Sequence, residues 1–109
     1  MYSIDLNNTY ANIEFDVNIP ELDINFHLLL QTNDNGSLFM SVFLNGEQLG
    51  KPFMCFPNQL IIPYPIIQEK IKGNLYFETV KNEYPSYENF GKTCFLYFVT
   101  LEEIKENAQ

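Results

Sequence analysis

The sequence has no tryptophan and no arginine, and it contains one histidine and two cysteines among 109 residues. Its six cations are all lysines and face 14 acids, so the formal net charge is −8. Proteins that bind phosphate backbones or anionic membrane surfaces rely on clustered lysine and arginine. The charge balance therefore indicates a protein that binds neither nucleic acid nor an anionic membrane.

Long apolar runs are also absent. No stretch reaches the roughly 18 residues of a membrane-spanning helix, and the opening segment MYSIDLNNTY has neither the basic start nor the apolar middle of a secretory signal. We therefore expect no membrane insertion. Cys55 and Cys94 each lie in an apolar run, and we predict that both are reduced thiols that pack as small hydrophobes.

Catalytic motifs are missing from the chain. It contains no phosphate-binding glycine loop, no HExxH string and no GxSxG string. A serine triad would have to use His27, and a Cys/His metal site would need about four ligands. The acids do not follow the spacing of an EF-hand loop. We predict no enzymatic activity, no cofactor and no metal, while a carboxylate pair acting as a small hydrolytic site stays an open alternative, because sequence does not show how far apart acids lie.

Apolar and aromatic residues are abundant, at 46% and 16% of the chain, which supplies a packed core and excludes wholesale disorder. The length favours a single β-rich domain over residues 1–109, with residues 1–9 and 105–109 as candidate extended tails. Residues 1–50 hold seven acids and no base. These acids form a solvated face in one interpretation, a docking face for a basic partner in a second, and a calcium site in a third.

Period-two alternation predicts strands over residues 10–18 and 23–31, and it places His27 on a polar strand face. Residues 37–44 are apolar on both faces, which is typical of a central strand. Asn45-Gly46 follows and predicts a type I′ hairpin turn. The returning strand runs to about Phe56, and Gly50 is a candidate bulge or kink within it.

Prolines 57, 63 and 65 interrupt the middle of the chain, and Pro65 is placed to begin a short helix that ends at Gly73. Strands are predicted over 74–80 and 93–100, and Thr100-Leu-Glu-Glu103 has the spacing of a helix capping box. The whole pattern predicts an all-β fold, either a small antiparallel β-sandwich or a partly open barrel, of six to seven strands with a short C-terminal helical tail.

Four aromatic residues stand out because they lie in polar or proline-rich loops. Tyr84, Tyr87 and Phe90 share one polar loop, and Tyr64 lies between two prolines. Either the loop folds back so that the rings cap the core, or the rings dock on a protein or a sugar. Sugar-binding modules usually present tryptophan, which this chain lacks. We therefore take Tyr64, Tyr84, Tyr87 and Phe90 as the candidate protein interface.

The order of signals between residues 35 and 98 is distinctive. A strand pattern over residues 35–46 ends in a hairpin turn, and the next strand begins with a Gly and a Pro in Leu49-Gly-Lys-Pro-Phe53. A further strand begins with a glycine in Lys72-Gly-Asn-Leu-Tyr-Phe77. The last, aromatic strand is Cys94-Phe-Leu-Tyr-Phe98, and the loop before it is Tyr84-Pro-Ser-Tyr-Glu-Asn-Phe-Gly91. This pattern resembles a family of small β-rich baseplate plug proteins of contractile-tailed bacteriophages. Members often have a tryptophan before the hairpin turn, where this chain has Phe39 and Phe43.

The resemblance implies a non-enzymatic structural subunit of a phage tail or baseplate, with no catalytic residues to carry over. Such a subunit would be assembled in the host cytoplasm into the virion, and its partners would be other tail proteins, copies of itself, or both. The alternative is a cytosolic β-sandwich module that binds a protein or a carbohydrate through the Tyr64 and Tyr84–Phe90 surfaces.

Overall fold

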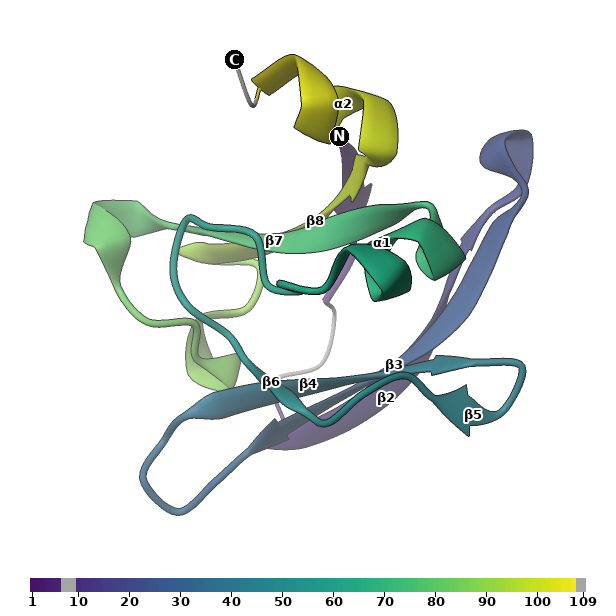
Figure 1. The fold of residues 1–109 in the computed structure, drawn as a ribbon. Coiled ribbons are helices and arrows are strands. Elements are labelled where there is room, and N and C mark those ends of the chain that lie inside the picture. Colours follow the sequence, from purple (N-terminus) through teal and green to yellow (C-terminus); the bar gives the residue numbers. More distant parts are fainter. Residues whose placement is uncertain (7–9, 108–109) are drawn as a thin grey trace.

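The computed structural model describes residues 1–6 and 10–107, which fold into two packed antiparallel β-sheets. One sheet has the order β2-β3-β4-β5, with β6 also pairing on β4, and the other has the order β1-β8-β7. The strands are β1 (Tyr2–Ile4), β2 (Asn12–Ile19), β3 (Ile24–Thr32), β4 (Leu38–Leu44), β5 (Glu47–Gln48), β6 (Phe53–Met54), β7 (Gly73–Thr79) and β8 (Cys94–Thr100). Figure 1 shows the sheets as two separate layers. The predicted antiparallel sandwich is therefore confirmed, and the sheets do not close into a barrel.

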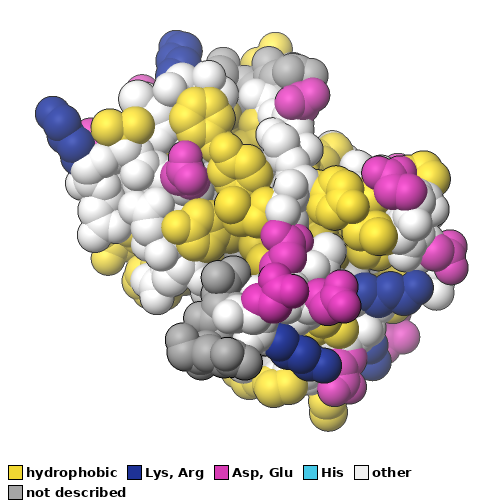
Figure 2. Space-filling view, turned by 90° about the horizontal axis from the view of Figure 1, so that it is seen from above, with side chains coloured by type: hydrophobic (Ala, Val, Ile, Leu, Met, Phe, Trp, Pro, Cys, Tyr) yellow, Lys and Arg dark blue, Asp and Glu magenta, His cyan; other side chains and the backbone are white. Residues whose placement is uncertain are grey.

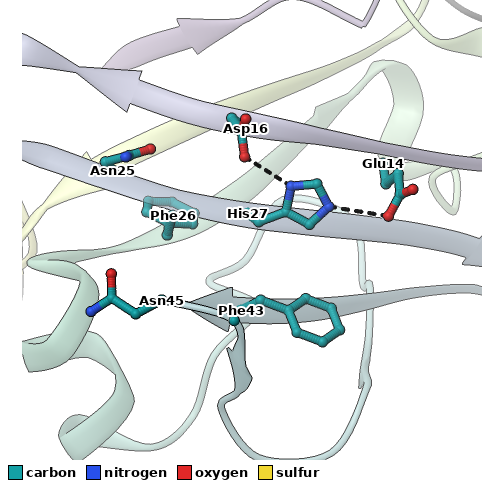
Figure 3. A pocket seen from close by; sticks show the side chains of 8 residues that line it. Glu14, Asp16, Asn25, Phe26, His27, Phe43 and Asn45 are labelled. Carbon is teal, nitrogen blue, oxygen red and sulfur yellow. Dashed lines mark hydrogen bonds and ion pairs between the residues drawn. The ribbon is translucent and has the colours of Figure 1, made fainter.

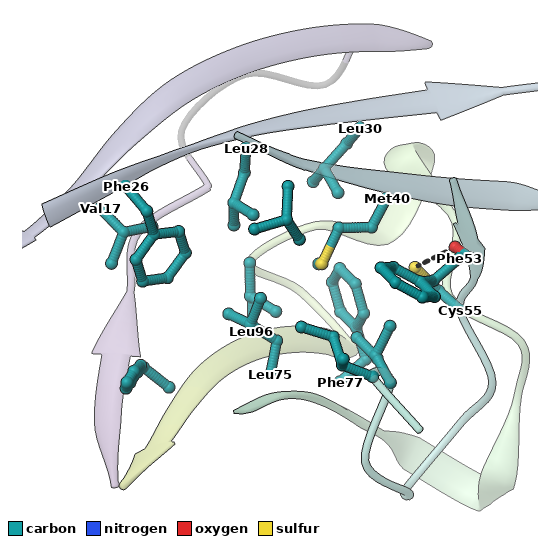
Figure 4. Packing of buried hydrophobic residues seen from close by; sticks show 14 of the residues in the cluster. Val17, Phe26, Leu28, Leu30, Met40, Phe53, Cys55, Leu75, Phe77 and Leu96 are labelled. Atoms are coloured by element: carbon teal, nitrogen blue, oxygen red, sulfur yellow. Dashed lines mark hydrogen bonds between the residues drawn. The ribbon is translucent and has the colours of Figure 1, made fainter. Parts of the chain in front are cut away.

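The core lies between the two layers. Alternate residues of β3 and β4 point inward, and they meet the inward-facing residues of β7 and β8, as Figure 4 shows. Phe26 of β3 packs against Phe98 of β8, with 5.8 Å between the ring centroids. The side chains at the centre of this layer are almost fully buried: Leu28, Leu30, Met40, Val42, Leu75, Phe77, Leu96 and Phe98.

The central position predicted for residues 37–44 is confirmed, since β4 pairs with β3 on one side and with β5 and β6 on the other. Asn45 and Gly46 both adopt positive φ, at 53° and 83°, as a type I′ turn requires. The returning strand is split into β5 and β6 around Gly50, whose φ is 76°. This split and the short strand β1 raise the strand number above the six to seven that we predicted.

Helix α1 (Pro65–Ile71) begins at Pro65 as predicted, but its predicted end at Gly73 is wrong. Lys72 takes the left-handed conformation at the C-cap, with φ of 63°, and its backbone N–H bonds to carbonyls of the last turn. Gly73 is instead the first residue of β7 and is buried under Phe98. A glycine at this position allows β7 to lie close to Val99 and Phe98 of β8, and it does not form a turn.

The predicted C-terminal capping box is confirmed. Thr100 Oγ1 accepts a hydrogen bond from the Glu103 amide at 3.2 Å, and Glu103 Oε1 accepts from the Thr100 amide at 3.1 Å. Helix α2 (Leu101–Asn107) follows and includes residues 105–107. Of the other candidate tail, residues 2–4 form β1, while residues 7–9 and 108–109 lie outside the described residues. Neither described helix has the length and apolar character needed to cross a membrane.

Candidate functional site

The segment of residues 57–62 lies along the free edge of β7 and builds one wall of a groove. Its backbone pairs with β7 at two points: Asn58 N–H donates to the Phe77 carbonyl at 2.8 Å, and Ile61 N–H donates to the Leu75 carbonyl at 2.9 Å. Proline at positions 57 and 63 prevents a regular strand here, because proline has no N–H to donate to a ladder. The segment is therefore attached to the sheet edge without being a strand of it.

Two asparagine side chains complete this attachment, one near each end of the segment. Asn74 of β7 is fully buried; its Oδ1 accepts from Ile62 N–H at 2.9 Å and its Nδ2 donates to the Ile62 carbonyl at 2.8 Å. Asn58 Oδ1 accepts from Thr79 N–H at 2.9 Å, and its Nδ2 donates to Asn82 Oδ1 at 2.9 Å. Each side chain stands in for a missing backbone partner.

The groove lies between this segment and the Gly50–Met54 connection, and its volume is about 710 Å³. Its large exposed apolar side chains are Phe56, Leu60 and Tyr64. No acid lines it, although the chain as a whole has a net charge of −8. The lining residues are Gly50, Lys51, Pro52, Phe53, Met54, Phe56, Gln59, Leu60, Ile61, Pro63 and Tyr64.

The four residues predicted as an interface divide into two pairs. Tyr64 lines the groove and is 57% exposed, and Tyr84 is 59% exposed with its ring edge against Phe56, itself a groove residue. Phe90 is only 3% exposed and stacks on Phe77 with ring centroids 6.0 Å apart. Tyr87 packs at the margin of the core. The structure thus brings Tyr64 and Tyr84 to one surface and places Phe90 in the core.

Sequence reasoning missed Phe56 and Leu60. Both lie beside the proline-rich stretch, where alternation gives no indication of which side chains face outward. The one usable signal was composition, because residues 51–66 hold many large apolar side chains and no acid. The same composition in a regular strand would indicate core, so only the placement of the segment identifies these residues as exposed.

A second apolar surface lies on the outer face of the smaller sheet. Tyr76 of β7 and Tyr97 of β8 are cross-strand neighbours there, and with Phe95 they are half-buried. Figure 2 looks down on this side and shows hydrophobic side chains gathered together, with acidic side chains beside them. This face adds to the apolar area on the surface of the protein.

His27 occupies a different place, on the outer face of the larger sheet. Its Nδ1 lies 2.9 Å from Asp16 Oδ1 and its Nε2 lies 3.1 Å from Glu14 Oε2, as Figure 3 shows. Phe43 of β4 meets the ring edge-on. These residues line an open pocket of about 440 Å³. Both ring nitrogens therefore lie within hydrogen-bond distance of a carboxylate.

The two cysteines are free and buried. Burial raises the pKa of both thiols, that of Cys94 to about 11, so neither is a thiolate nucleophile at neutral pH. Among residues 1–6 and 10–107, no group of three or more His, Cys, Asp and Glu side chains is arranged to hold a metal ion.

Comparison with known proteins identifies the family. Residues 1–102 match the family model described as cyanophage baseplate Pam3 plug gp18. The chain belongs to this family. No curated protein matches the chain. The match covers the acidic first third as well as the segment that carried the sequence resemblance, so the predicted membership of a phage baseplate plug family is confirmed.

As a member of the plug family, the chain is a structural component of the phage tail baseplate and hence of the virion. A baseplate component contacts other virion proteins. The described surface of this plug-family chain has two features suited to such contacts, namely the acid-free apolar groove and the acidic outer face around His27.

The histidine provides a pH-dependent prediction. Hydrogen bonds to Asp16, and then to Glu14, raise the pKa of His27 above 6.5, while burial opposes the shift. Because the pKa is higher in the folded state, the charged His27 ring stabilises the fold. This stabilisation is fully present below the unfolded pKa, about 6.5, and is lost as pH rises through the folded pKa. We expect His27→Gln to lower the melting temperature at pH 5.5 and to have little effect at pH 9.

Nuclear magnetic resonance titration of the His27 ring checks the cause directly. The pKa of His27 should fall toward 6.5 in the double variant Glu14→Gln/Asp16→Asn. An unchanged pKa in that variant would show that the two carboxylates do not stabilise the imidazolium.

Proposed function

We propose that the chain is a non-enzymatic structural subunit of the phage baseplate that works through protein–protein contacts, with the groove beside residues 57–62 as one contact surface. The observation that carries the proposal is the acid-free cluster of exposed apolar side chains in that groove. Its occupant is an apolar segment of another tail protein, because two copies of a chain with net charge −8 repel each other. Assembly takes place in the host cytoplasm.

The interface centres on Tyr64 and Tyr84, two of the four residues that the sequence pointed to. Tyrosine is favoured at interfaces because its ring buries apolar surface while its hydroxyl forms hydrogen bonds or stays hydrated. Phe56 links the two rings, since Tyr84 contacts it and it lines the groove with Tyr64. The other two of the four pack elsewhere: Tyr87 lies against the core and Phe90 stacks on Phe77.

Removal of apolar side chains from the groove tests the proposal. Leu60 is 41% exposed and Tyr64 is 57% exposed, so Leu60→Ser/Tyr64→Ser removes little core packing. Serine at position 64 also supplies a preferred N-cap for α1. Because burying one such side chain contributes about 1.5–3 kcal/mol, we expect affinity for a tail partner to fall at least about tenfold. The measurement is co-expression with the other tail proteins of the same phage, followed by affinity purification through a tag on this chain.

The matched control is Tyr10→Ser/Val80→Ser, in which the two side chains are 68% and 47% exposed and lie outside the groove. A tail protein that co-purifies with the wild type and the control but not with the groove variant supports the proposal. Equal retention by both variants would contradict the role of the groove. A chain that associates only with itself, or with no tail protein, would overturn the assignment of the occupant.

A further inference from the structure

The outer edge of β2 is open and regular enough to pair with an added strand. β2 is an end strand, and among the described residues no other strand pairs with its outer edge. All eight of its residues are in continuous register with β3, so no bulge twists the edge away. It contains neither proline nor lysine, the residues with which proteins commonly protect an edge. Such an edge is a template for an added strand.

The register shows which backbone groups face outward. Thr32 N–H donates to the Ala11 carbonyl at 2.9 Å, so residue 11 and every second residue after it bond to β3. The alternate residues direct their N–H and C=O groups to the open edge: Asn12, Glu14, Asp16 and Asn18. An added strand therefore forms its hydrogen-bonded pairs opposite Glu14 and Asp16.

Side chains on the two faces define the chemistry of that strand. Residues opposite Glu14 and Asp16 share the outer face with these acids, and opposite charges across a ladder are favourable. Residues opposite Ile13 and Phe15 share the inner face, where both side chains are only partly buried. A pocket of about 270 Å³ lies between β1 and the second half of β2.

From this geometry we infer that β2 binds an extended segment of another virion protein, in which basic residues alternate with apolar ones. A second copy of β2 is disfavoured, because antiparallel self-pairing along the whole open edge sets Glu14 of each copy opposite Asp16 of the other. The inference rests on the proposed function, since the segment comes from another virion protein. It involves a different surface from the groove.

A capped peptide that alternates lysine and valine over the length of β2 tests the inference. The peptide is titrated into the full chain, and binding is followed by calorimetry and by amide chemical shifts. We expect the amides of Glu14 and Asp16 to shift and the affinity to fall with salt. Methylation of the backbone nitrogens of the lysine residues removes the N–H groups that donate to β2 and should abolish binding. N-methylation of the valine residues, whose N–H groups point away, should leave it unchanged.

Variants separate this surface from others of like charge. Glu14→Gln/Asp16→Asn should weaken peptide binding about 5- to 10-fold, whereas Glu69→Gln/Glu106→Gln removes the same charge on α1 and α2 and should have little effect. The groove variant Leu60→Ser/Tyr64→Ser should bind the peptide normally, so failure of the groove proposal is distinguishable. The inference would be overturned if binding did not depend on which backbone nitrogens are methylated. It would also be overturned if the peptide did not bind, or if the protein formed a dimer through β2.

Discussion

Replacing Gly73 with alanine is expected to lower the free energy of unfolding by about 3 kcal/mol or more. A Cβ atom at this position would overlap the Val99 carbonyl oxygen and lie 2.6 Å from Cε2 of the Phe98 ring. Neither neighbour can yield cheaply, because one is the backbone of the paired strand and the other is a fully buried ring. The expected fall in melting temperature is about 12–24 °C for a domain of this size.

Thermal and urea unfolding, followed by circular dichroism, measure this effect. Gly36→Ala is the control, because Gly36 has a φ of 83° and a Cβ added there would meet no atom within 4 Å. That variant should lose only about 1–2 kcal/mol through backbone strain. If Gly73→Ala were no less stable than Gly36→Ala, close packing under Phe98 would not be the reason for the glycine.

Asn74→Ala is the second change with a large expected effect, about 2–5 kcal/mol, because it leaves the buried N–H groups of Ile62 and Leu75 without their acceptor, Asn74 Oδ1. The Ile62 carbonyl loses one of its two donors and keeps Gln68 Nε2 at 2.9 Å. The loss should also loosen the wall of the groove, since Asn74 fastens one end of the 57–62 segment to β7. Native-state hydrogen exchange measures both consequences. The Ile62 amide should exchange much faster than in the wild type, by more than the global loss of stability explains.

Asn58→Ala provides the comparison at the other end of the segment. It should expose the Thr79 amide to exchange, because Asn58 Oδ1 accepts from that N–H at 2.9 Å, and it should leave Ile62 protected. Asn58 is only partly buried, so its loss should cost less than that of Asn74. Protection of Ile62 that survives Asn74→Ala would contradict the role of this side chain as a backbone substitute.

Prediction from sequence succeeded where the signal was local. The period-two alternation of residues 10–18 and 23–31 and the Asn45-Gly46 turn correspond to β2, β3 and a type I′ turn. The capping box at Thr100 was likewise predicted from the spacing of Thr100 and Glu103. Each depends on residues within a few positions of one another, so the chain's chemistry specifies it before any tertiary contact forms.

The candidate site was predicted only in part. Tyr64 and Tyr84 were singled out as loop aromatics, and the structure leaves both exposed at or beside the groove. Phe90 had the same sequence signal but stacks on Phe77 in the core. An aromatic ring in a polar loop either caps the core or faces a partner, and the path of the loop over the sheet decides between the two.

By itself, the sequence determined the β-rich class, the turns, the helix cap and the acidic first half, because these depend on composition and on short-range spacing. Tertiary structure alone decided that Asn74 holds Ile62, 12 residues away, and that Asn58 holds Thr79, 21 residues away. It also decided which edge of β2 stays open and which apolar side chains stay exposed. Those outcomes depend on the packing of distant segments, which short-range spacing does not specify.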